Sequence, residues 1–188
     1  MRVGSMPDRS CFAKRGAVSH TGGMHIFVDA RMMGATVSRG IGRVIAALLP
    51  RIIARCPHIH WPILLRYAEQ RRYLAGLPGS ITIIERDIPW YGFREQLQVA
   101  WLILRHRPDR CFFFHWNTPV LMAWKWFGCF IHDLLLFHQP ASAKLSTRSF
   151  PIAKIKRYVQ RGVVWLVARR SKAIAVPTRY VQEDVQTF

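Results

Sequence analysis

Short apolar runs alternate along this chain with longer stretches in which apolar residues recur at helical spacing. An apolar run of roughly four to eight residues between turn residues predicts a buried strand, and the longer periodic stretches predict helices. The predicted strands are 25–30, 59–66, 81–84, 111–115, 128–132 and 173–176. The predicted helices are 41–55, 69–75, 93–106, 151–170 and a last one that begins after Thr178.

The alternation of strands and helices predicts the fold class. Strands that are apolar throughout and separated by helices indicate a parallel sheet covered on both faces. We therefore expect an α/β fold, a Rossmann-like doubly wound parallel sheet over residues 24–188, with ligands bound beyond the carboxyl ends of the strands. Residues 1–23 mix four basic residues with glycine and serine, and we expect them to be a disordered extension outside the fold.

Two of the predicted helices are amphipathic. In 93–106 the apolar positions at helical spacing are Leu97, Ala100, Trp101 and Leu104, and Pro108 ends the helix. In 151–170 one face is apolar, the opposite face is basic and two aromatic residues flank them: Ile152, Ile155, Val159, Val163 and Leu166, then Lys154, Arg157 and Arg161, then Tyr158 and Trp165. Such a helix can pack on the sheet and offer cations to anionic lipid, although an ordinary solvated face is the plainer alternative.

A pair of glycines follows the first predicted strand, in the run 38–43 directly before an apolar helix. Glycine lets the backbone approach a ligand closely, and the free N–H groups at a helix start attract phosphate. Arg43 can pair with phosphate oxygens. A dinucleotide fingerprint needs a third glycine where Ile45 stands, so a nicotinamide cofactor is disfavoured. The alternative is that Gly40 and Gly42 only permit tight strand-to-helix packing.

Polar side chains follow the later strands at the same predicted edge of the sheet. His115 and Asn117 come after the fourth strand, His132 and Asp133 after the fifth, and Thr178 after the sixth. A neutral imidazole can donate to or accept from a sugar hydroxyl, and an adjacent carboxylate can fix its tautomer. The structural alternatives are a histidine satisfied by the backbone, an aspartate that serves a turn, and a threonine that caps the next helix.

Four segments, taken in order, resemble the N-terminal half of the GT-B glycosyltransferases, in the large retaining class that uses nucleotide sugars. They are 26–31, 40–43, 130–134 and 173–178, and only Thr178 departs from the pattern, which usually has serine there. The resemblance covers residues 24–188. It implies the acceptor-side half of a two-domain cleft, in which a hexosyl group passes from a nucleotide sugar to a glycan or lipid-linked acceptor.

The same resemblance implies roles for individual residues. His132 and Asp133 would lie at the catalytic centre, near the transferred sugar. Substrate-binding roles fall to Gly40, Gly42, Arg43 and Thr178, and the position of His115 and Asn117 after the fourth strand adds these two residues to the set. No metal and no cofactor beyond the donor are expected. The donor-binding domain would come from a separate chain or from a missing part of this one, so this half alone is expected to bind substrates with little or no catalysis.

Charge and cysteine content limit the partners, metal sites and cellular compartments that fit this chain. Lys and Arg exceed Asp and Glu by 28 to 10, a formal charge of +18 that favours anionic partners. Between Leu134 and Gln182 there are ten Lys or Arg and no acidic residue. The four cysteines lack C-x-x-C spacing, which argues against a zinc site and favours a reducing compartment. No apolar run reaches the length of a membrane span.

These features leave two classes of function open. We expect either the glycosyltransferase domain, cytoplasmic and peripheral on the inner face of the membrane, or a non-catalytic basic module that docks on anionic membrane or nucleic acid. Nucleic acid is the less favoured partner, because the aromatic residues at 112–114, Trp124 and Trp126 lie in apolar runs typical of a core rather than of a stacking surface.

Overall fold

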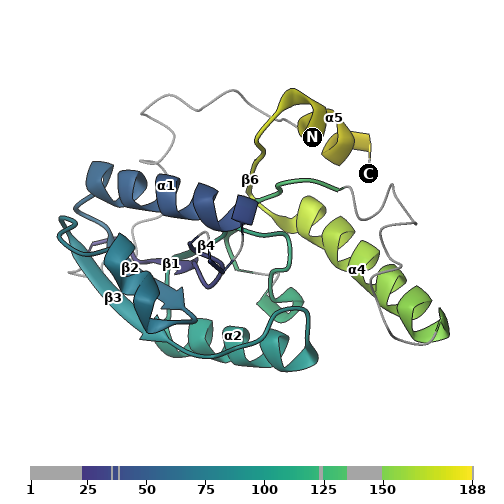
Figure 1. Ribbon diagram of the computed structural model, residues 1–188, viewed down its shortest axis with the longest axis horizontal. Coiled ribbons are helices and arrows are strands. Elements are labelled where there is room, and N and C mark those ends of the chain that lie inside the picture. The colour runs from purple at the N-terminus through teal and green to yellow at the C-terminus, as the bar shows by residue number, and fades with distance from the viewer. Residues whose placement is uncertain (1–22, 35, 38, 123–124, 135–149, 188) are drawn as a thin grey trace.

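Six parallel strands form one sheet in the order β3-β2-β1-β4-β5-β6 (Figure 1). The computed structural model describes residues 23–34, 36–37, 39–122, 125–134 and 150–187, apart from the side chains of residues 39 and 150–157. This strand order is that of a Rossmann-like doubly wound sheet, so the predicted fold class is confirmed. The strands are β1 Ile26–Asp29, β2 His60–Leu65, β3 Ser80–Glu85, β4 Arg110–Phe113, β5 Phe127–Phe130 and β6 Ala173–Ala175.

Helices connect the strands and cover both faces of the sheet. The α-helices are α1 Arg39–Arg55, α2 Phe93–His106, α4 Phe150–Arg170 and α5 Arg179–Thr187, and the 3₁₀ helices are η1 Ala68–Tyr73 and η2 Val120–Met122. Figure 1 shows α1 and α2 on opposite sides of the strands. Each predicted helix is present, and the segment predicted as a helix at 69–75 is a 3₁₀ helix.

The two faces of the sheet carry separate apolar cores, because successive strand residues point to opposite sides. Phe27 packs in the core beneath α2 and α4, together with Ile103 and Val164. Its neighbour Val28 packs in the core beneath α1, together with Ile45. The apolar character of the strands therefore reflects burial on both faces, as predicted.

The strand order reverses at β1. Val28 pairs in parallel with Ile63 of β2 on one side and with Phe112 of β4 on the other. In a sheet of this kind the connections leave the two neighbouring strands toward opposite faces, which opens a crevice at their carboxyl ends. The residues that follow β1 and β4 are therefore the ones placed to form a ligand site.

Helix α1 begins earlier than predicted, at Arg39 rather than near residue 41. Gly40 and Gly42 consequently lie in its first turn and not in a loop before it. A Cβ atom on Gly42 would lie inside the van der Waals contact of the Gly34 carbonyl oxygen and 2.7 Å from that of Met32. The Gly42 carbonyl also accepts a hydrogen bond from the Gly34 N–H at 3.0 Å. The space at Gly42 is filled by the chain's own backbone.

Helix α2 has the predicted boundaries but exposes much of its predicted apolar face. Of the four residues that define this face, only Ala100 is buried. The helix instead packs through the opposite face, which contains Val99 and Ile103. The three exposed residues of this face, together with Phe93 one turn before Leu97, form what we call the α2 stripe. Their exposed fractions are Phe93 78%, Leu97 46%, Trp101 53% and Leu104 53%.

Helix α4 also differs in part from its predicted apolar face. Val159 is 60% exposed, whereas Val164 and Val167 are buried. Val163 packs against the core as predicted, and the side chains of Ile152 and Ile155 lie outside the described part of the structure. The burial of Val164 and Val167 shows that the C-terminal half of α4 covers the sheet.

Some expectations fall on residues that the structure does not describe. These include the extension at 1–22, with Cys11, and Trp124. Among the helices in the described ranges, none has both the length and the apolar character that a bilayer crossing requires.

Candidate functional site

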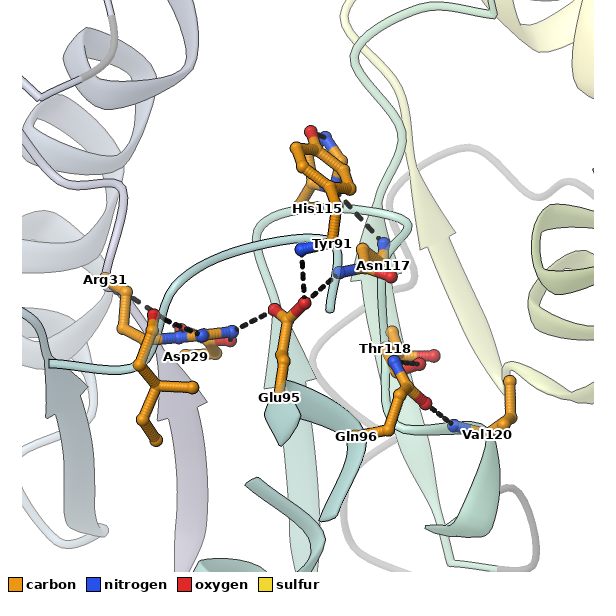
Figure 2. A network of polar contacts seen from close by, with 10 residues as sticks. Asp29, Arg31, Tyr91, Glu95, Gln96, His115, Asn117, Thr118 and Val120 are labelled. Carbon is orange, nitrogen blue, oxygen red and sulfur yellow. Dashed lines mark hydrogen bonds and ion pairs between the residues drawn. The ribbon is translucent and has the colours of Figure 1, made fainter. Parts of the chain in front are cut away.

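A network of polar side chains lies where the carboxyl ends of β1 and β4 meet (Figure 2). Asp29 ends β1, and Arg31 follows two residues later. Glu95 comes from the first turn of α2. His115 and Asn117 follow β4, as predicted. The reversal of strand order thus brings together groups that are up to 88 residues apart in the sequence, since Asn117 and Asp29 differ by that number.

Arg31 is the buried cation of the network, with a 2% exposed fraction. Its guanidinium pairs with Asp29 Oδ2 at 2.6 Å and with Glu95 Oε1 at 2.6 Å, and it donates to the Ile88 carbonyl at 3.1 Å. Burial opposes the charge, but the two carboxylates outweigh it and hold the pKa of Arg31 above its usual value. Because these partners use most of its donors, Arg31 serves to fix the strand end.

Glu95 connects three segments of the chain. One carboxylate oxygen pairs with Arg31, and the other accepts from the Tyr91 N–H at 2.7 Å and from the Asn117 side-chain amide at 2.5 Å. Burial raises the pKa of Glu95, and the Arg31 charge opposes that rise. Glu95 therefore positions Asn117 and the loop before α2 around the crevice.

His115 is neutral and has a defined tautomer. Its Nδ1 accepts from the Asn117 N–H at 3.1 Å, so the ring proton sits on Nε2, which donates to the Tyr91 hydroxyl oxygen at 3.2 Å. Burial, together with the nearby His132, lowers the pKa of His115 to about 4. The Tyr91 hydroxyl is left with its own proton to donate, and Tyr91 is exposed at the rim.

The backbone at Tyr91 has a conformation that L-residues rarely adopt, with φ at 62°. Its N–H bond to Glu95 and its hydroxyl bond to His115 hold it there. Partial burial of the side chain, with the negative charges of Glu95 and Asp133, raises the pKa of Tyr91 to about 12, so the hydroxyl stays protonated at neutral pH. Strained residues of this kind concentrate at functional sites.

His132 stands beside this network. Its Nε2 donates to the Phe114 carbonyl at 2.9 Å, so the neutral ring presents Nδ1 as an acceptor. Burial lowers the pKa of His132, which favours that neutral form. Asp133 follows on the exposed rim. The structure therefore brings His115, Asn117 and His132 to one place, as predicted from their positions after neighbouring strands.

The other predicted site residues lie apart from the network. Gly40 and Arg43 are exposed on the first turn of α1, and Gly42 is packed against the loop after β1. Thr178 accepts from the Val181 N–H at 3.2 Å and so caps α5, as predicted. Across the described ranges, no hydrogen bond or ion pair links Gly40, Arg43 or Thr178 to the polar network.

Two cavities meet at Trp90. The first, of about 20 Å³, lies within the network and has room for about one water molecule. The second, of about 460 Å³, is lined by Tyr67, Glu69, Arg72, Tyr73 and Trp90, among others. The Trp90 indole N–H is buried and has no partner among the described residues. An unsatisfied buried donor costs about 1–3 kcal/mol. A ligand that places a hydrogen-bond acceptor at the Trp90 indole N–H would remove this cost and bind more tightly as a result.

Metal chemistry is not indicated within the part of the chain that the structure describes. No three His, Cys, Asp or Glu side chains there could hold a metal ion. Burial raises the pKa of Cys111 and Cys129 to about 12, so both thiols are unreactive at neutral pH. The site is instead a set of hydrogen-bonding groups around a crevice.

Comparison with known proteins adds no family to this picture. No protein-family model matches the chain, and no curated protein matches it. The functional argument therefore depends on the Rossmann-like fold and on the groups at the ends of β1, β4 and β5.

Proposed function

We propose that this chain forms the acceptor-binding half of a GT-B glycosyltransferase, which transfers a hexosyl group from a nucleotide sugar to a hydroxyl of a glycan or lipid-linked acceptor. A second domain, from another chain or another part of the protein, would bind the donor nucleotide. The reaction would take place at the inner face of the membrane.

One observation carries the proposal: the crevice offers neutral groups suited to sugar hydroxyls. The Tyr91 hydroxyl can donate, and His132 Nδ1 can accept from the hydroxyl that receives the sugar. The charged groups beneath them are two carboxylates and one arginine, so the network has a formal charge of −1. A negative site disfavours a diphosphate and suits a neutral polyhydroxyl ligand.

Ligand-detected NMR on the full chain tests this function. We expect saturation transfer to some members of a panel of neutral mono- and disaccharides, and loss of that signal in the His132→Ala variant. His60→Ala is the matched control, because His60 begins β2 at the opposite edge of the sheet and bonds Thr82 at 2.8 Å. Absence of saccharide binding, or equal binding by His132→Ala, would reject the assignment.

The competing class is a non-catalytic basic module, which the formal charge of +18 favours. Such a module would bind anionic surfaces and ignore saccharides, and its binding would fall steeply with salt. The saccharide panel therefore separates the two functions, whereas membrane binding alone does not.

A further inference from the structure

Helix α2 presents an apolar face to solvent beside the candidate site. The α2 stripe, Phe93, Leu97, Trp101 and Leu104, recurs at helical spacing, and each of its residues is at least 46% exposed. At 1.5 Å per residue the stripe is roughly 17 Å long. A continuous exposed apolar surface of this kind marks an interaction site more often than chance exposure does.

The stripe is not a displaced core face. Helix α2 already packs on the sheet through its other side, where Val99, Leu102 and Ile103 are buried. Rotating the helix to bury the stripe would expose these three residues and withdraw Glu95 from Arg31. The helix therefore has two apolar faces, and the part of the structure that is described covers only one of them.

The charges next to the stripe indicate what binds there. Exposed Arg94 and Arg105 flank it on the same side of the helix, and exposed Arg107 follows its end. The single acidic residue of α2 is Glu95, which is buried in the polar network. A helix with Phe, Leu and Trp on one side and arginine beside them has the composition of segments that lie in the surface of anionic bilayers.

We propose that the α2 stripe is a membrane-contacting surface, which inserts among the acyl chains of an anionic bilayer while the flanking arginines bind lipid headgroups. The helix would lie flat on the bilayer rather than cross it. This assigns membrane contact to α2 rather than to the basic helix α4, whose composition also suits anionic lipid.

This orientation brings the N-terminal end of α2 to the lipid surface. Phe93, at the stripe's first position, is two residues from Glu95, the centre of the polar network. Tyr91, which is exposed and lies two residues before Phe93, is the part of the network nearest to the stripe along the chain. The membrane surface is compatible with the proposed function but does not depend on it, because binding to lipid requires no sugar transfer.

Sedimentation of the full chain with lipid vesicles tests the surface. The vesicles are phosphatidylcholine alone or mixed with phosphatidylglycerol. For Leu97→Gln/Trp101→Gln we expect partitioning onto mixed vesicles to fall roughly 30-fold, since two half-exposed apolar side chains no longer insert. For Arg94→Gln/Arg105→Gln we expect partitioning onto the mixed vesicles to fall about fivefold for each charge removed. This difference from the wild type should disappear at high salt, which screens the charges. The matched control is Val159→Gln/Trp165→Gln, which removes two exposed apolar residues of α4.

Three results would overturn this proposal. They are unchanged sedimentation of Leu97→Gln/Trp101→Gln, a larger loss in the α4 control, or self-association of the wild-type chain that the same α2 substitutions abolish. The last result would mean that the stripe binds a second copy of the chain. Glutamine is a good helix former, and unchanged melting curves verify that each variant is folded. A negative result in the vesicle experiment would not change the outcome expected for the saccharide panel, so the two proposals can fail separately.

Discussion

The side-chain amide of Asn117 donates to Glu95 at 2.5 Å, and this bond joins the end of β4 to the first turn of α2. Through Glu95 the same connection reaches Arg31 and thus the end of β1. Three segments that are distant in the sequence are held by one carboxylate, which makes Glu95 the residue on which the geometry of the crevice depends.

Removal of the Glu95 carboxylate should destabilise the protein strongly. Glu95→Ala leaves the buried guanidinium of Arg31 with one carboxylate partner and leaves two donors unpaired. We expect the free energy of unfolding in urea to fall by about 3–5 kcal/mol. Glu85→Ala is the control, because its bond to Arg71 at 2.8 Å is much more exposed and should be worth at most about 1 kcal/mol. Equal losses in the two variants would contradict the central role of Glu95.

Alanine should have opposite effects at the two glycines of α1. In Gly42→Ala the new methyl group meets backbone carbonyl oxygens, so we expect a loss of more than about 3 kcal/mol. At Gly40 no atom lies within 4 Å of the new Cβ, and Gly40→Ala should stabilise by up to about 1 kcal/mol. Thermal melts of both variants measure this. If Gly42→Ala is tolerated, the first turn of α1 does not pack as described.

Acid should weaken the fold through His115. Its pKa is about 4 in the folded protein and near 6.5 when unfolded, so the unfolded state binds the proton more tightly. Above pH 6.5 the residue has no effect, and between 6.5 and 4 stability falls by up to about 3 kcal/mol.

Substitution of His115 should therefore flatten the pH profile of the melting temperature. In His115→Phe, the part of the acid-induced fall in melting temperature that comes from protonation of His115 disappears. At higher pH the melting temperature of the variant differs from that of the wild type by a constant amount. His60, His106 and His132 also have lowered pKa values and retain their own contributions in the variant. Parallel profiles for the wild type and the variant would show that His115 titrates normally.

The hydroxyl of Tyr91 should contribute to ligand binding, and its removal should also cost about 1 kcal/mol of stability because it accepts a hydrogen bond from His115. Tyr91→Phe removes the proton that the hydroxyl donates to a ligand and leaves the ring in place. For any saccharide that binds the wild type, we expect affinity to fall about three- to tenfold, the usual value of one neutral hydrogen bond. Tyr180→Phe, on exposed α5, is the matched control. An unchanged dissociation constant would exclude Tyr91 from the site.

Much of the architecture could be predicted because local signals agreed with the fold. The boundaries of α2 are a clear case: Gly92 precedes the helix in extended conformation, and Arg107 ends it in the left-handed conformation before Pro108. The apolar strands likewise predicted a sheet covered on both faces. The grouping of His115, Asn117 and His132 followed from the rule that the carboxyl ends of parallel strands share one edge.

What could not be predicted depends on tertiary contacts. Periodicity marks an apolar stripe on α2 but assumes that it faces the core, and the structure buries the other side. Glu95 gave no signal of its role, because its partner Arg31 is 64 residues away. The spacing of Asp29 and Arg31 was a usable hint, since alternate residues project on the same side of a strand. At Gly42 the sequence pattern indicated room for a ligand, and the backbone after β1 occupies that room.

The first turn of α2 reaches both outward and inward. Phe93 points into solvent, and Glu95 anchors the ends of β1 and β4. A tilt of this turn would therefore displace Arg31 and Asn117 together. If the helix settles on lipid, adsorption and the shape of the crevice become thermodynamically linked. A bilayer would then act as an allosteric effector of this protein, and ligand affinity measured on vesicles would differ from that in free solution.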